Sequence, residues 1–149
     1  MYQYTADGKL HSVEDIASNV GYLYSYDGDG RVEGYTQYNL SDKTNTLAIS
    51  YKYDEESRLF EAITTTDYFA DSNKADWQLK EQFLYDDDTD LLTSYQALFY
   101  NTNGNNLAGV FAYDAVQRLT TKTYTLSKGT SSVQNQIGYT YNDATNAYG

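Results

Sequence analysis

A nine-residue pattern recurs six times along the chain and constrains its fold more than any other feature of the sequence. The pattern reads aromatic-x-Tyr-Asp-x-x-Gly-Arg-Leu. Its copies span residues 2–10, 24–32, 51–59, 83–91, 111–119 and 139–147. The intervals between copies differ, so the pattern is fixed at the motif and variable between motifs. A unit repeated in this way is typical of an array in which neighbouring repeats bury one another's surface.

Each copy has the chemistry of a β-hairpin. Two aromatic residues separated by one position share a face of a strand, because side chains alternate. The Asp that follows can accept hydrogen bonds from nearby backbone amides, and a Gly three positions later suits the left-handed end of the turn. Gly8 and Gly30 keep this glycine. The other copies carry Ser57, Thr89, Gln117 and Thr145. A non-glycine residue held there costs roughly 1 kcal/mol, so we expect those turns to be strained or built differently.

The residues that lead into each motif alternate in character, as half-buried antiparallel strands do. Tyr22, Tyr24 and Tyr26 share one face, for example, while Leu23 and Ser25 share the other. Polar stretches that predict turns at the opposite edge lie at 41–45, 70–76, 101–106 and 127–132. We therefore expect one all-β array over 1–149, an antiparallel meander of repeated β-hairpins with about ten to twelve strands.

One segment carries a different signal. Ser12, with Asp15 three positions on, resembles a helix capping box. The stretch 12–19 is too short for a stable helix, and we interpret it as a loop or a single turn.

Composition excludes several classes of function. The chain has 10 Lys and Arg against 21 Asp and Glu, and this net charge of -11 argues against a nucleic-acid partner. It has no Cys, and His11 is its one histidine, so we expect no thiolate or multi-histidine metal site and no cofactor. No apolar run approaches the roughly 20 residues of a membrane span, and the first residues lack a secretory signal. Exposed carboxylates at turns are poor acids at neutral pH, so we do not expect an enzyme.

Tyrosine is abundant, with 18 residues in the chain. The motif places aromatic side chains at equivalent hairpin positions: Tyr4, Tyr24, Tyr26, Tyr51, Tyr53, Phe83, Tyr85, Phe111, Tyr113, Tyr139 and Tyr141. Such a set predicts cross-strand aromatic pairs that stabilise the sheet, and the alternative is a stacking surface for sugar rings. Aromatic residues away from the motif are the better candidates for glycan binding: Tyr35, Tyr38, Tyr68, Trp77, Tyr95, Tyr100 and Tyr124.

The other motif positions are mainly charged. They are held by Asp27, Gly30, Arg31, Asp54, Arg58, Leu59, Asp86, Asp114, Arg118 and Leu119. We expect each basic residue to pair with an acid of its own turn, which gives Lys9 with Asp7, Arg31 with Asp27, Arg58 with Asp54 and Arg118 with Asp114. The alternative is a stripe of cations for a phosphate or a glycan.

The fourth copy gathers carboxylates at its turn. Asp86, Asp88 and Asp90 offer the oxygen ligands that calcium prefers, so this turn is a candidate metal site. The spacing of an EF-hand is absent, and the alternative is a solvated hairpin tip.

These motifs resemble the YD-repeat, or RHS-repeat, family. Tyr24–Val32 is the copy most similar to the family pattern, followed by Tyr51–Leu59 and Phe111–Leu119. Asp90 and Asn146 stand where the family carries a basic residue. The resemblance implies a curved or spiralling strip of β-hairpins within a large exported or cell-surface protein, such as a bacterial toxin shell. Carbohydrate binding is also ascribed to some members.

We therefore expect a non-catalytic structural module of a large bacterial secreted or cell-surface protein, part of a shell or scaffold, with carbohydrate binding or adhesion as the alternative. The chain begins and ends within a repeat, so we interpret it as a piece of a larger protein or a short isolated array. Its partners would be neighbouring repeats of that protein. Because the outer strands have unpaired edges and the chain has no Pro to guard them, we also expect self-association through the sheet edges.

Overall fold

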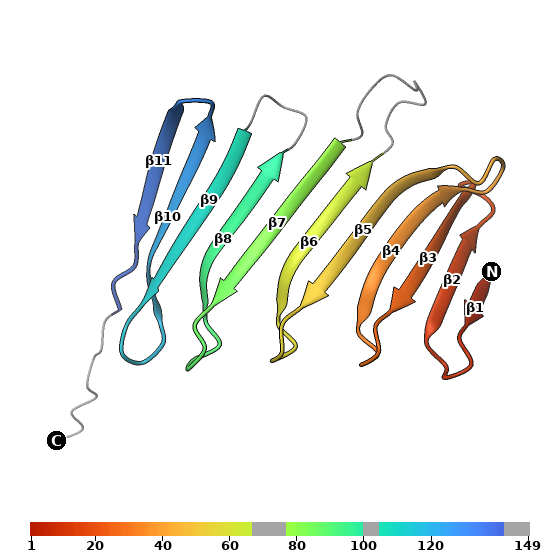
Figure 1. Cartoon of the computed structure of the whole chain (residues 1–149), viewed down its shortest axis with the longest axis horizontal. Helices are drawn as coiled ribbons and strands as arrows, with labels where there is room; N and C mark the ends of the chain where they lie inside the picture. Colours follow the sequence, from red (N-terminus) through yellow and green to blue (C-terminus); the bar gives the residue numbers. More distant parts are fainter. Residues whose placement is uncertain (67–76, 100–104, 142–149) are drawn as a thin grey trace.

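The computed structural model of the chain describes residues 1–66, 77–99 and 105–141. These form one open sheet of 11 strands, ordered in space as they are in the sequence (Figure 1). The strands are β1 (Tyr2–Tyr4), β2 (Leu10–Asp15), β3 (Val20–Tyr26), β4 (Val32–Asn39), β5 (Asn45–Tyr53), β6 (Leu59–Thr66), β7 (Trp77–Tyr85), β8 (Leu92–Phe99), β9 (Asn105–Tyr113), β10 (Leu119–Lys128) and β11 (Ser131–Gly138). The predicted all-β antiparallel meander is confirmed.

The sequence interpretation of 12–19 is wrong in its first half, whereas residues 16–19 do form a turn. Ser12 to Asp15 do not form a loop or a helical turn but belong to β2, which pairs with β3 from Ser12 opposite Leu23 to Asp15 opposite Val20. The paired neighbour supplies backbone hydrogen bonds that a short capping-box signal does not outweigh. Among the described residues, no helix is long and apolar enough to cross a membrane.

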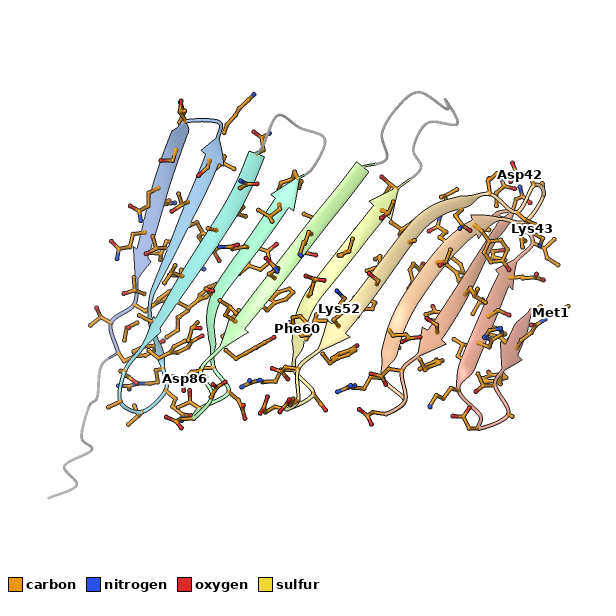
Figure 2. The ribbon with its side chains drawn as sticks, viewed as in Figure 1. Met1, Asp42, Lys43, Lys52, Phe60 and Asp86 are labelled. Carbon is orange, nitrogen blue, oxygen red and sulfur yellow. The ribbon has the colours of Figure 1, made fainter. Side chains whose placement is uncertain are left out.

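The motif turns that the structure describes lie at one end of the strands, which we call the tip edge (Figure 1). They join β1 to β2, β3 to β4, β5 to β6, β7 to β8 and β9 to β10, so the first five motifs make five hairpins. The described connections between hairpins, residues 16–19 and 40–44, lie at the opposite edge. Figure 2 shows this division, with Asp86 at the tip edge and Asp42 and Lys43 at the other.

The strand register separates two faces of the sheet. Pairing of Tyr24 with Tyr35, of Tyr35 with Ile49 and of Phe83 with Tyr95 gathers aromatic and aliphatic side chains on the same side, which we call the aromatic face. Pairing of Ser50 with Ile63 and of Lys52 with Glu61 places mostly small, polar and charged side chains on the other side, the polar face.

The sheet is a single layer, and it has almost no core. Within the described part of the chain, the buried hydrophobic residues are Ala62 and Ala97 alone. The accessible surface is 10354 Å² for a chain of 16.9 kDa, whereas a compact monomer of that mass exposes about 7,700 Å². Stability must therefore come from contacts between neighbouring strands and hairpins rather than from a packed interior.

The described turns without glycine follow the two outcomes expected for them, and Thr145 lies outside the described residues. Ser57 and Gln117 occupy the left-handed position with φ of 69° and 65°, in the place that Gly30 holds with φ of 84°. These two turns are strained. The fourth turn is built differently, because it is one residue longer. Its left-handed residue is Asp90, with φ of 58°, rather than Thr89.

The longer fourth turn also changes the alignment of the motif. The amide of Asp86 donates to the carbonyl of Leu91, and Tyr85 pairs with Leu92. In the third hairpin the corresponding partners are Arg58 and Leu59. Asp90 therefore stands at the glycine position, and Leu91 stands at the position of the motif arginine.

The left-handed turn residues give a test of this geometry. We expect Gln117→Gly to stabilise the protein by about 0.5–1 kcal/mol, because glycine relieves the positive φ. The control is Gln96→Gly, at an exposed position inside β8, which should destabilise by about 0.5–1 kcal/mol. Denaturant unfolding measures both values, and a loss of stability in Gln117→Gly would contradict the assignment.

Candidate functional site: the joints between hairpins

In the second, third and fifth hairpins, the motif aspartate holds the turn by accepting hydrogen bonds from the motif arginine. In the third hairpin, Oδ1 of Asp54 accepts from the backbone amide of Arg58 at 2.7 Å, and Oδ2 accepts from Nε of the same arginine at 2.7 Å. The second and fifth hairpins repeat this arrangement with Asp27 and Arg31 and with Asp114 and Arg118.

The first hairpin uses different residues for the same purpose. Thr5 replaces the aspartate, and its Oγ1 accepts from the amide of Lys9 at 2.9 Å. The side chain of Lys9 lies 2.8 Å from Asp7. All four predicted ion pairs within the turns are therefore present in the structure.

The second motif tyrosine fastens each hairpin to the one before it. Its hydroxyl donates to the carbonyl of the first strand residue after the preceding turn. The distances are 2.7 Å for Tyr26 to Leu10, 2.8 Å for Tyr53 to Val32, 2.8 Å for Tyr85 to Leu59, 2.8 Å for Tyr113 to Leu92 and 2.7 Å for Tyr141 to Leu119. The same bond thus recurs along the whole array.

The ring of the same tyrosine receives the cation of the preceding turn. The distances from the cationic group to the ring centroid are 5.2 Å for Lys9 over Tyr26, 4.6 Å for Arg31 over Tyr53, 5.0 Å for Arg58 over Tyr85 and 4.6 Å for Arg118 over Tyr141. Each of these cations binds an acid of its own turn and the tyrosine of the next hairpin. We call this set of contacts, tyrosine hydroxyl to carbonyl and cation to ring, a joint.

Arg58 makes further contacts across its joint. Besides Asp54, its guanidinium lies 2.8 Å from Asp90 and 3.3 Å from Asp87 of the following hairpin. The hydrogen bond to Asp54 and the further carboxylates raise the pKa of Arg58 above its ordinary value. This arginine therefore neutralises acids of two neighbouring turns.

The geometry gives the predicted calcium site no support. Oδ1 of Asp86 accepts from the amides of Asp88 and Thr89 within its own turn, and Asp90 pairs with Arg58. Over residues 1–66, 77–99 and 105–141, no group of three or more acidic or histidine side chains is arranged to hold a metal ion.

The predicted glycan-binding aromatics that the structure describes are half-buried rather than free on the surface. Tyr35 contacts Tyr22 and Tyr24, with centroids 6.0 and 5.3 Å away, and Tyr124 lies 6.2 Å from Phe111. The motif aromatics Tyr24 and Phe111 thus contact aromatic residues outside the motif on neighbouring strands.

Tyr95 and Tyr38 also have charged partners. Tyr95 contacts Phe83 at 5.3 Å and donates to Glu81 at 2.7 Å, and burial together with that carboxylate raises the pKa of Tyr95 to about 12. Tyr38 lies on the polar face with Lys43 at 5.1 Å from its ring.

The side chains of three other candidates for glycan binding are not described by the structure. Tyr68 and Tyr100 lie outside the described residues, and Trp77 is described only through its backbone. Glycan binding by the seven aromatics remains a prediction.

A charged cluster around a buried glutamate on the polar face was not foreseen from the sequence. Glu61 is 5% exposed, and its carboxylate lies 2.7 Å from Lys52 and 2.6 Å from Lys80. Hydrogen bonds from these two lysines lower the pKa of Glu61. Lys52, Glu61 and Lys80 stand on β5, β6 and β7, so the cluster links the third hairpin to the fourth.

The joint hydrogen bond is tested by removing one hydroxyl. We expect Tyr53→Phe to destabilise the protein by about 0.5–1.5 kcal/mol, because the carbonyl of Val32 loses its donor. Tyr24→Phe, on the same face but with no hydrogen bond found for its hydroxyl, is the control and should change stability little. Denaturant unfolding compares the two, and equal effects would count against the joint.

The contact between the Asp54 carboxylate and Arg58, which we call the carboxylate clamp, predicts that stability depends on pH. Partial burial alone would raise the pKa of Asp54, but the hydrogen bonds from Arg58 outweigh it and hold the pKa below the ordinary value of 3.8. The stabilisation is thus complete above about pH 5, where Asp54 is charged even in the unfolded chain, and is lost as pH falls through the lower folded value.

Asp54→Asn is the variant for this dependence. It should destabilise the protein at about pH 6 and much less at about pH 2. Glu55→Gln, an exposed neighbour in the same turn, is the control and should have little effect at either pH. Thermal unfolding at the two pH values provides the measurement, and an equal loss for Asp54→Asn at both would refute the charged clamp.

The fold has a known counterpart among solved structures. No protein-family model matches the chain, and no curated protein matches it in sequence. A structure of the Photorhabdus luminescens Tc holotoxin pore contains a similar region, with a TM-score of 0.70 and 18% identity. The similarity covers 84% of this chain and 6% of that one, so the chain spans a small part of the larger protein's length. At this identity the likeness shows a shared fold.

Proposed function

We propose that the chain is a non-catalytic structural repeat module, a section of the wall of a large secreted shell such as that of a toxin complex. The observation that carries the proposal is the joint, because its tyrosine bond recurs from the first hairpin to the sixth motif. A contact repeated in this way holds each hairpin in the same position relative to the one before it, which is what a continuous wall requires. The fold shared with part of the Tc holotoxin pore structure supports this role.

The single-layer architecture supports a wall rather than a self-contained domain. Isolated domains bury their apolar faces between two packed layers, and this sheet has only one. Its outer strand β11 is exposed along its whole length, with Val133 73% exposed. Such surfaces are suited to cover by neighbouring repeats of a larger protein, and we propose that these repeats are its natural partners outside the cell.

The unpaired outer strand β11 predicts that the isolated chain associates with itself. We expect it to self-associate, because β11 presents unpaired backbone groups and carries neither charge nor proline. Sedimentation over a wide range of protein concentration should show a rising average mass. Val133→Lys with Gln134→Lys, which place charges on the edge, should weaken the association.

A matched control distinguishes pairing through the outer strand β11 from nonspecific association. Gln96→Lys introduces a charge at an exposed position on the interior strand β8 and should leave the association unchanged. A strictly monomeric chain at all concentrations, or equal weakening by the control, would contradict association through the edge.

A further inference from the structure

The joint between the fourth and fifth hairpins differs from the others. In the joints at Tyr26, Tyr53, Tyr85 and Tyr141, a lysine or arginine of the preceding turn lies over the ring. At Tyr113 the position of that cation is held by Leu91, as the turn hydrogen bond from Asp86 shows. Across the described residues, no cation lies over the ring of Tyr113.

The acceptor for the absent cation is still present. In the second, third and fifth hairpins, Oδ2 of the motif aspartate accepts from Nε of the arginine at 2.7 Å. In the fourth hairpin, Oδ1 of Asp86 is used by its own turn, but within the described part of the chain no hydrogen bond or ion pair reaches Oδ2. One carboxylate oxygen therefore keeps its acceptor capacity.

A cleft lies at the same joint. It has a volume of about 400 Å³, and its walls include Asp86, Leu91, Phe111, Tyr113 and Asp114. The equivalent cleft of the first joint, of about 340 Å³, contains Lys9, whose ammonium lies 5.2 Å from the Tyr26 ring. The cleft at Tyr113 combines the same aromatic wall with a carboxylate but provides no cation of its own.

We propose that the cleft at Tyr113 binds a guanidinium group from outside the array, in the place that the motif arginine takes at its sister joints. A guanidinium suits the site better than an ammonium, because its planar face stacks on an aromatic ring while its N–H groups reach a carboxylate. The ligand is either a free guanidinium compound or an arginine side chain of another polypeptide, since both present the same chemistry.

The proposal is tested by NMR titration of the full chain with L-argininamide. The aromatic signals of Tyr113 and Phe111 should shift with saturation. L-citrullinamide has nearly the same shape and keeps the α-ammonium group but replaces the charged guanidinium with a neutral urea, so it should bind at least about tenfold more weakly. The peptide Gly-Arg-Gly is a second arm: binding at least as tight as that of argininamide assigns an arginine of a polypeptide, and weaker binding assigns a free compound.

Variants separate this site from general attraction of cations to an acidic protein. Leu91→Arg provides the cation within the chain and should weaken argininamide binding at least about tenfold, whereas the control Leu91→Met should preserve it. Asp86→Asn, which retains the turn acceptor but removes the charge, should also weaken binding. Equal shifts with citrullinamide, or binding that Leu91→Arg leaves unchanged, would overturn the proposal.

Discussion

A single tyrosine per repeat, used through both its hydroxyl and its ring, is the contact on which this sheet depends. The sheet has one layer, and its buried hydrophobic residues in the described part are two alanines, so no packed interior holds the strands together. The tyrosine hydroxyl satisfies a carbonyl of the preceding hairpin, while in four joints the cation of that hairpin covers the ring. Because each joint connects only neighbours, stability is expected to accumulate along the array rather than to reside in one nucleus.

The joints also explain how a chain with a net charge of -11 tolerates acidic turns. The acids gather at the tip edge, where like charges in adjacent turns would repel. Each motif cation lies between two turns, and Arg58 reaches acids of both its own turn and the next. The motif cations therefore offset part of the repulsion between the acidic turns. Where the cation is absent, at Leu91, the neighbouring carboxylate Asp86 retains an unused oxygen.

The sequence was sufficient to predict what is local and periodic. The alternation around Tyr24 and Tyr51 predicted the strands, and the Asp-to-Arg spacing predicted the ion pairs within turns. Contacts between hairpins depend on strand register, which one residue in a turn can shift. For that reason the Glu61 cluster and the bond from Tyr53 to Val32 were not foreseen. The sequence alignment assigned Asp90 to the basic position of the motif, whereas the extra residue in the fourth turn puts it at the glycine position. The capping-box signal at Ser12 failed because tertiary pairing outweighs a short local preference.

The position of the joints accounts for the unequal spacing of the motifs. Every joint contact is made by residues at or next to the tip edge, such as Arg58 and Tyr85. The connection between the second and third hairpins, near Asp42 and Lys43, lies at the opposite edge (Figure 2). A connection can therefore lengthen without moving the next tyrosine from its carbonyl, provided the strands that it joins still pair. An added residue in a motif turn acts differently, because it changes which side chain faces the next ring, as Leu91 does at Tyr113. Selection on such an array would thus constrain the length of the motif turns and tolerate variation in the connections opposite them.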